Sequence, residues 1–182
     1  MDIETPLTDK KIKKLKAGDR IYLSGYIYTA RDQAHQKLFN LLNNNKELPI
    51  DLKDAVIYYT GPAPSKPGQV IGACGPTTSY RMDKFTPILL KNGLKGMIGK
   101  GPRSKEVKQS IVENNAVYFA ATGGAAALLS KTIIDSKIIA YPELKTEAIR
   151  LLKVSKFPLV VINDSYGNDL YESGQNKYNE LR

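Results

Sequence analysis

The sequence predicts a single domain of the α/β class. Short apolar runs, typical of buried strands, alternate with segments of helical periodicity along almost the whole chain. The 182 residues suit one domain with a single core. A content of 42% hydrophobic and 25% charged residues is ordinary for a globular protein. We therefore expect one domain over residues 1–182 that ends in a polar, frayed tail over 171–182.

Strands are predicted where β-branched and aromatic residues gather in short runs. The first run, IYLSGYIYT, alternates loosely between apolar and polar residues, and the second, AVIYYT, stops at Gly61-Pro62. A Pro/Gly loop, PAPSKPGQ, follows the second run. The predicted strands cover residues 21–29, 55–60, 69–73, 95–99, 116–121, 132–140 and 158–163.

Helices are predicted where apolar residues recur every three or four positions. Ala34, Leu38 and Leu42 show this spacing, and an asparagine run at 43–45 ends their helix. Thr77 or Thr78 is the expected N-cap of a later helix, because a threonine side chain can accept from a free N–H of the first turn. The predicted helices cover residues 31–43, 78–92, 104–114, 125–131 and 143–153.

Composition excludes several classes of protein. No stretch approaches the roughly 20 consecutive apolar residues of a membrane-spanning helix, and the N-terminus lacks the apolar region of a secretory signal. The single cysteine, Cys74, cannot form an internal disulfide. With His35 as the single histidine, the chain can assemble neither a Cys/His zinc site nor a cluster held by four thiolates. We expect a soluble, cytoplasmic protein whose metal chemistry, if any, comes from outside this chain.

The formal net charge of +9 leaves three interpretations open. It fits a nucleic-acid surface, a positive surface for an anionic partner or substrate, or a solvated lysine-rich surface. The charge is densest near the N-terminus, without the interleaved aromatic residues of single-strand binders. The lysines in question are Lys10, Lys11, Lys13, Lys14 and Lys16.

Four predicted strand-to-helix junctions carry unusual residues. Exposed N–H groups at such junctions favour an anion, and ligands of alternating α/β folds gather beyond the carboxyl ends of strands. Two guanidinium groups suit a substrate with two carboxylates, because each can hold one carboxylate bidentately. The junctions are Thr29-Ala30-Arg31-Asp32, Gly75-Pro76-Thr77-Thr78-Ser79-Tyr80-Arg81, Gly99-Lys100-Gly101 and Thr122-Gly123-Gly124.

Spacing alone leaves structural alternatives for these residues. Arg31 and His35 are four apart and so share a helix face, as Thr77 and Arg81 do. An Arg-Asp pair at a helix start is, however, most often a capping or surface arrangement. His35 and Cys74 are more readily explained as packed residues than as reactive groups. The phosphate loop and the nucleophile elbow are both absent from the sequence. The residues thus indicate an anion-binding α/β domain with Arg31, Arg81 and Lys100 near one pocket, but they specify no reaction.

Four motifs in a fixed order resemble a known family. They are Thr29-Ala30-Arg31-Asp32-Gln33-Ala34-His35, Tyr59-Thr60-Gly61-Pro62, Gly75-Pro76-Thr77-Thr78-Ser79-Tyr80-Arg81-Met82-Asp83 and Lys100-Gly101. The chain resembles the C-terminal domain of class I fumarate hydratases and the β subunit of L-tartrate dehydratase. The resemblance covers about residues 5–170, and the third motif is too long and irregular to arise readily by chance.

The resemblance implies a swivelling β/β/α layered domain and a reversible hydration of fumarate to (S)-malate. It also implies a partner α subunit that carries a [4Fe–4S] cluster, one iron of which acts as a Lewis acid. We expect an α2β2 heterotetramer that is inactive without the α subunit. The same chemistry on L-tartrate stays open as an alternative. So do, from other classes, a non-catalytic dicarboxylate-binding module and a basic nucleic-acid-binding domain.

The resemblance also implies roles for individual residues. Thr77 is expected to act at the carbon that gains or loses a proton, with Arg31, Arg81 and Lys100 on the substrate carboxylates. The supporting residues are expected to be Asp32, His35, Gly75 and Thr78, with close backbone approach at Gly101, Gly123 and Gly124. The chain departs from the family at Cys74 and at Pro102, where a backbone N–H is lost.

Overall fold

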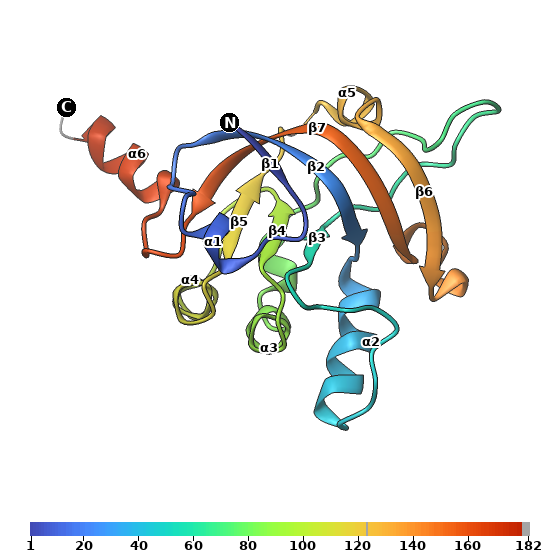
Figure 1. Cartoon of the computed structure of the whole chain (residues 1–182), viewed down its shortest axis with the longest axis horizontal. Helices are drawn as coiled ribbons and strands as arrows, with labels where there is room; N and C mark the ends of the chain where they lie inside the picture. Colours follow the sequence, from blue (N-terminus) through green and yellow to red (C-terminus); the bar gives the residue numbers. More distant parts are fainter. Residues whose placement is uncertain (123, 180–182) are drawn as a thin grey trace.

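The computed structural model describes residues 1–122 and 124–179. Its strands belong to one sheet in which the neighbours follow the order β1-β2-β3-β4-β5-β7-β6. Figure 1 shows the sheet strongly curved, with β2 beside β7. The strands are β1 (Asp2–Glu4), β2 (Arg20–Thr29), β3 (Val56–Tyr58), β4 (Gly96–Gly99), β5 (Val117–Ala120), β6 (Ile133–Ala140) and β7 (Ile149–Asn163).

The sheet closes on itself through β7. Strands β2, β3, β4 and β5 are parallel neighbours, and β7 runs antiparallel to both β5 and β2. These pairings make a barrel-like ring, to which β1 is added beside β2 and β6 beside β7. Closure leaves the ring strands without a free edge. The carboxyl ends of the four parallel strands lie at one rim.

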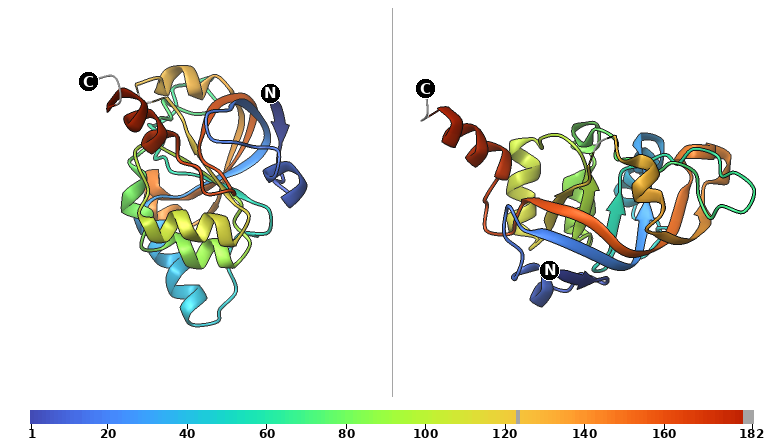
Figure 2. Two further views of the ribbon diagram at one scale, coloured as in Figure 1. Left: turned by 90° about the vertical axis from the view of Figure 1, so that its left-hand side faces the viewer. Right: turned by 90° about the horizontal axis from the view of Figure 1, so that it is seen from above.

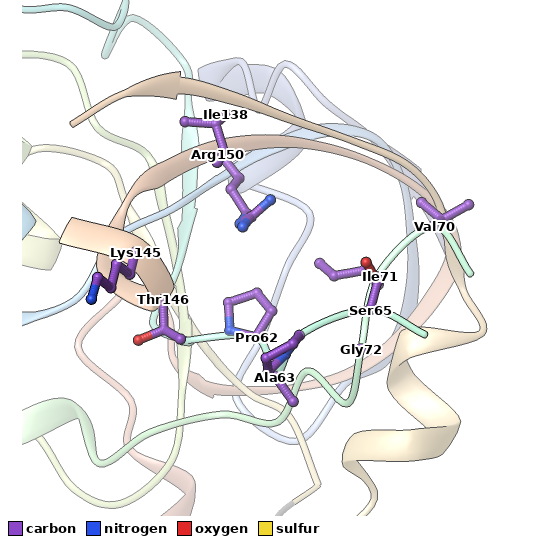
Figure 3. A pocket seen from close by; sticks show the side chains of 11 residues that line it. Pro62, Ala63, Ser65, Val70, Ile71, Gly72, Ile138, Lys145, Thr146 and Arg150 are labelled. Atoms are coloured by element: carbon purple, nitrogen blue, oxygen red, sulfur yellow. The ribbon is translucent and has the colours of Figure 1, made fainter. Parts of the chain in front are cut away.

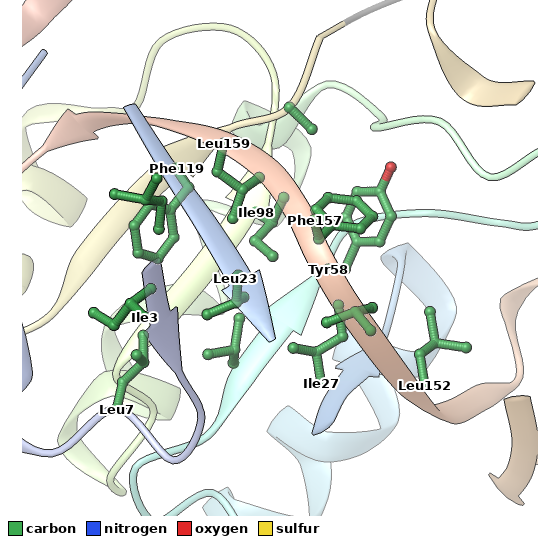
Figure 4. Packing of buried hydrophobic residues seen from close by; sticks show 14 of the residues in the cluster. Ile3, Leu7, Leu23, Ile27, Tyr58, Ile98, Phe119, Leu152, Phe157 and Leu159 are labelled. Carbon is green, nitrogen blue, oxygen red and sulfur yellow. The ribbon is translucent and has the colours of Figure 1, made fainter. Parts of the chain in front are cut away.

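Side chains that point into the ring form the first hydrophobic core. Leu23 and Ile27 of β2 meet Phe157 of β7, and Tyr58 packs edge-on against Phe157 with ring centroids 5.3 Å apart (Figure 4). The Tyr58 hydroxyl donates to the Cys74 carbonyl at 2.8 Å, so its one polar atom is satisfied. The interior is therefore filled with side chains.

A second core lies between the ring and three helices on one side of it (Figures 1 and 2). These helices are α2 (Asp32–Asn43), α3 (Thr86–Lys91) and α4 (Lys105–Glu113). The remaining helical elements are α1 (Asp9–Ile12), η1 (Ser79–Met82), α5 (Ala126–Ser130), η2 (Pro142–Glu147) and α6 (Leu170–Asn179). Among the described residues, no helix has both the length and the apolar character needed to cross a lipid bilayer.

The predicted α/β class is confirmed, and so are most of the central elements. The expected strands 21–29, 55–60, 95–99, 116–121 and 132–140 correspond to β2, β3, β4, β5 and β6. The expected helices 31–43, 104–114 and 125–131 correspond to α2, α4 and α5. The sheet forms a closed, barrel-like arrangement, and the swivelling β/β/α layered arrangement that the resemblance implies is not confirmed.

The helix predicted over 143–153 is wrong. A 3₁₀ segment ends at Glu147, and β7 begins at Ile149. Lys145 has φ 54° and ψ −108°, values that no helix accommodates. The β7 backbone pairs with β2 on one side and β6 on the other. The strand predicted over 158–163 is the second half of the same long strand. Tertiary pairing therefore overrides a local helical preference.

Three further predictions need correction. No strand forms at 69–73, where residues 70–72 are bends, and the helix predicted over 78–92 is broken into η1 and α3 around Asp83. Thr78 precedes η1 but its side chain makes no capping bond. The expected frayed tail is helical up to residue 179, and residues 180–182 lie outside the described part of the chain. The elements β1 and α1 were not predicted.

Candidate active site

The candidate residues gather where three parallel strands end. Arg31 follows β2, and Lys100 directly follows β4. The segment 75–81 lies beside both ends, because Thr78 and Lys100 form a parallel β-bridge and Arg81 bonds Asp32. The Ser79 N–H donates to the Lys100 carbonyl at 2.9 Å, and the Lys100 N–H donates to the Thr77 carbonyl at 3.3 Å. The sheet thus brings distant segments of sequence to one rim.

Asp32 joins the first junction to the third motif. Its carboxylate accepts from Arg81, with 2.9 Å between Nε and Oδ1 and a second bond from Nη2 to Oδ2. The hydrogen bond from Arg81 holds the pKa of Asp32 below its usual value, and the carboxylate in turn raises the pKa of Arg81. Arg81 is 37% exposed and Asp32 36%, so the pair remains open to solvent. Asp32 is thus closer to Arg81 than to Arg31, whose Nε is 4.0 Å away.

Arg81 keeps a free face in this arrangement. A guanidinium group has five N–H donors, and the Asp32 contacts use one on Nε and one on Nη2. Three N–H groups remain, on Nη1 and Nη2, and these form the end-on fork that matches a second carboxylate. The pair also borders a hollow of about 510 Å³ together with Lys37 and Lys84. Arg81 can therefore be oriented by one carboxylate while it holds another.

Arg31 is positioned but weakly paired. It is the extended residue before α2, and its carbonyl accepts from the His35 N–H at 2.8 Å. Its Nη2 is 3.8 Å from Oε1 of Glu147, and its Nε is buried without a hydrogen-bond partner among the described residues. Gly61 leaves space beside it, because a Cβ there would lie 2.6 Å from Arg31 Nη1. A buried donor without an acceptor costs free energy, so the Nε of Arg31 is an unsatisfied polar atom of this rim.

Thr77 is anchored to the end of β3. Its N–H and its hydroxyl both donate to the Tyr59 carbonyl, at 2.8 and 2.9 Å. The Thr60 hydroxyl donates to the Gly75 carbonyl at 2.7 Å and fixes the preceding turn. Because the hydroxyl proton of Thr77 is directed at Tyr59, the lone pairs of the oxygen are left for another group. Thr77 is half-buried at the rim.

The junction glycines differ in what they do: the expected close approach is found at Gly75, whereas a Cβ on Gly124 would meet nothing within 4 Å and one on Gly101 would make only an ordinary contact with Thr78. Gly101 and Gly124 have φ of 82° and 81°, a region that favours glycine. A Cβ on Gly75 would lie 2.9 Å from the Cβ of Ala126, so α5 approaches the third motif closely. Gly123 lies outside the described residues. Lys100 is exposed, which leaves its side chain at the surface of the rim.

His35 lies behind the rim and not in it. The ring is fully buried and meets Tyr59 edge-on at 5.2 Å between centroids. Its Nδ1 is 2.9 Å from the Arg31 carbonyl, which can only accept, so Nδ1 carries the proton. Burial lowers the pKa of His35 to about 4, and the imidazole is neutral at physiological pH. His35 therefore supports the backbone at Arg31.

Two supporting residues were missed by the sequence analysis. Glu147 faces Arg31, and its Oε2 accepts from the Gln33 N–H at 2.9 Å at the start of α2. Arg103 is a buried cation whose Nε donates to Asp83 at 2.7 Å. Glu147 is 116 residues from Arg31 in a segment predicted to be helical, so no local pattern marked it. Asp83 was part of the third motif, but no sequence pattern indicated that Arg103 is its partner.

Cys74 is a packed residue, as expected. Its side chain is fully buried, and burial raises the pKa of the thiol to about 11. Among residues 1–122 and 124–179, no group of three or more His, Cys, Asp or Glu side chains could hold a metal ion. The sequence contains one cysteine, and one residue cannot supply the several thiolates by which proteins hold an iron–sulfur cluster.

Comparison with known proteins agrees with the motifs. The family described as Fumarase C-terminus matches residues 1–174. A protein of Methanocaldococcus jannaschii, provisionally named L(+)-tartrate dehydratase subunit beta, is 41% identical over 180 residues. The match covers 96% of this chain and 92% of that protein. Fumarate hydratase class I, anaerobic, of Escherichia coli is 36% identical over 181 residues, which are 97% of this chain and 33% of the relative.

Fumarate hydratase 2 of Leishmania major is 34% identical over 175 residues, 94% of this chain and 31% of the relative. The chain thus spans nearly the whole length of one relative and about a third of the two fumarate hydratases. Fold and site together define an α/β domain with a closed sheet and an arginine cluster at the carboxyl ends of its parallel strands. The chain belongs to the Fumarase C-terminus family.

Proposed function

We propose that this chain is the cluster-free β subunit of a hydro-lyase that interconverts fumarate and (S)-malate. The observation that carries the proposal is the pair of guanidinium groups at one rim. Arg31 has an unsatisfied buried Nε, and Arg81 keeps an end-on fork beyond its bonds to Asp32. Two such groups can hold the two ends of a dicarboxylate. Family membership supports the reaction class.

In the proposed reaction, Thr77 exchanges a proton with the substrate. During hydration, the Thr77 hydroxyl turns from the Tyr59 carbonyl and gives its proton to the carbon that becomes CH₂, while a water molecule supplies the hydroxide that forms the C–O bond at the neighbouring carbon. The remaining proton of that water returns to the Thr77 oxygen. The reverse direction returns the proton to the Thr77 oxygen as hydroxide leaves. An alkoxide is a costly intermediate, so nearby positive charge must stabilise it, and Lys100 is the candidate. Proton loss beside a carboxylate builds charge on that carboxylate, which the guanidinium groups stabilise.

The proposal includes a partner α subunit. When bound there, a [4Fe–4S] cluster would supply Lewis-acid chemistry for the substrate hydroxyl. We propose an α2β2 assembly in the reducing cytoplasm, in keeping with the single unpaired cysteine. We also propose that the domain swivels against its partner to close the site. The name of the Methanocaldococcus jannaschii relative, with 92% of its length matched, supports a separate subunit.

L-Tartrate is the second candidate substrate. The relative named for tartrate is 41% identical and matched over nearly its whole length, whereas the fumarate hydratases are matched over about a third. Tartrate dehydration uses the same C–O cleavage between two carboxylates and differs by one hydroxyl group. Contacts to that hydroxyl therefore decide between the substrates.

The test is an anaerobic assay of fumarate hydration, followed by loss of fumarate absorbance. The chain is assayed alone and after mixing with its reconstituted cluster-bearing partner, and L-tartrate is then substituted. We expect activity in the mixture alone. Faster turnover of L-tartrate would select the second candidate. Activity with neither substrate, although the partner is loaded with cluster and bound, would contradict both.

A further inference from the structure

A cavity of about 340 Å³ lies beside the candidate active site and contains none of its proposed catalytic residues. Its walls are the Pro/Gly loop after β3, the end of η2, and the strands β6 and β7. We call it the Arg150 cavity, because Arg150 of β7 projects into its middle (Figure 3). The volume lies in the range of small-molecule sites.

Arg150 brings an uncompensated charge into this cavity. Its Nε is buried, and its side chain makes no hydrogen bond or ion pair with the described residues. Its backbone is held in place, since the Arg150 N–H donates to Thr29 Oγ1 at 3.0 Å. The residues that line the cavity include Lys145 but neither aspartate nor glutamate. A guanidinium group that is partly desolvated and unpaired is costly, and an anion offsets that cost.

The rest of the lining indicates which anion fits. The apolar part of the lining includes Pro62, Ile71 and Ile138, which surround the guanidinium (Figure 3). The other side-chain donors of the lining are Lys145, Ser65 and Thr146, and the Lys145 ammonium points away from the Arg150 guanidinium (Figure 3). A phosphate needs several donors around its oxygens, whereas a planar carboxylate is satisfied by one bidentate guanidinium. We propose that the Arg150 cavity binds a small organic carboxylate with an apolar body.

The cavity shares a wall with the candidate active site. Pro62 lines the cavity, and the preceding residue, Gly61, lies against Arg31. A Cβ on Gly61 would be 3.2 Å from the carbonyl oxygen of Thr146, another lining residue. Glu147, which follows Thr146 in the sequence, faces Arg31. A ligand in the cavity would therefore contact the segments that position Arg31, without contacting Arg31 itself.

The test uses benzoate as the probe and benzamide as its neutral counterpart, with the full chain and two-dimensional NMR. We expect benzoate to shift the amide signals of 65–72 and 145–146, and benzamide to bind at least about tenfold more weakly. Arg150→Gln should weaken benzoate binding by about tenfold or more. Lys153→Gln, an exposed cation on the same strand, is the matched control and should leave binding unchanged.

Several outcomes would overturn the proposal. Equal binding of benzoate and benzamide to the wild-type chain would mean that the cavity does not recognise charge. Shifts confined to the neighbourhood of Arg31 and Arg81 would place benzoate in the candidate active site. Equal binding by wild type and Arg150→Gln would remove Arg150 from the site. If Arg150→Gln does not fold, the comparison of benzoate with benzamide still decides the matter.

Discussion

The third motif depends on a buried ion pair that can be tested directly. Asp83 Oδ1 accepts from Arg103 Nε at 2.7 Å, and its Oδ2 accepts from the Ser104 N–H at 2.7 Å. The Arg103 side chain is 0% exposed, and its guanidinium lies 4.9 Å from the centre of the Tyr118 ring. Asp83→Ala would leave this cation buried and without its carboxylate. Such a loss costs about 3–5 kcal/mol of unfolding free energy.

The measurement is urea unfolding of the full chain, followed by circular dichroism. With a slope of about 2 kcal/mol per molar urea, the midpoint of Asp83→Ala should fall by about 1.5–2.5 M. Glu172→Ala is the control, because Glu172 is 66% exposed and its pair with Lys108 at 2.6 Å is worth about 1 kcal/mol or less. Equal midpoint shifts for the two variants would refute the reasoning. Asp83→Asn keeps a hydrogen-bond acceptor, so its urea midpoint should lie between those of the other two variants. This variant replaces Asp83→Ala in the comparison if Asp83→Ala does not fold.

Three further predictions concern single residues. Arg81→Lys should keep the fold and partner binding but reduce turnover by about 10²–10³, since an ammonium group cannot hold Asp32 and a substrate carboxylate bidentately. Near-normal turnover in the fumarate assay would remove Arg81 from the site. Cys74 should resist a thiol reagent until the chain is unfolded, because it is buried and its thiol pKa is raised to about 11; rapid labelling of the native chain would contradict the packing. His35 should stay neutral down to a pH of about 4, whereas it charges near 6.5 in the unfolded chain. Stability should therefore fall by roughly 3 kcal/mol as the pH drops through that window. NMR of the single imidazole checks the titration, and a midpoint near 6.5 would disprove its burial.

The sequence predicted those parts of the fold in which local pattern and tertiary structure agree. The run AVIYYT is apolar on both faces, as the buried parallel strand β3 requires, and Ser104 accepts from the Val107 N–H at 3.3 Å as an N-cap should. The helix prediction for residues 143–153 was wrong because Glu, Leu, Lys and Ala, which are common in this segment, are good helix formers. What makes 149–153 a strand is pairing with β2 and β6, which are distant in sequence.

The candidate site was predictable in its residues but not in its contacts. The motifs marked Arg31, Thr77, Arg81 and Lys100, and the structure places them at one rim. The spacing also put Asp32 next to Arg31, whereas its bidentate partner is Arg81, 49 residues away. Pairings of this kind depend on the order of strands in the sheet, which a single sequence does not reveal. Their functional roles remain predictions for the turnover assay.

The net charge of +9 does not explain how this rim would bind a dicarboxylate. Arg31 and Arg81 are matched locally by the carboxylates of Asp32 and Glu147, so these four side chains together carry no net charge, and Lys100 adds a single positive charge at the rim. Non-directional attraction from this cluster is therefore weak. Binding must come from the direction of the free N–H groups, which Asp32 fixes on Arg81 and Gly61 leaves room for on Arg31. A site of this kind favours the geometry of two separated carboxylates over mere negative charge, and that is the discrimination a hydro-lyase of small dicarboxylates needs.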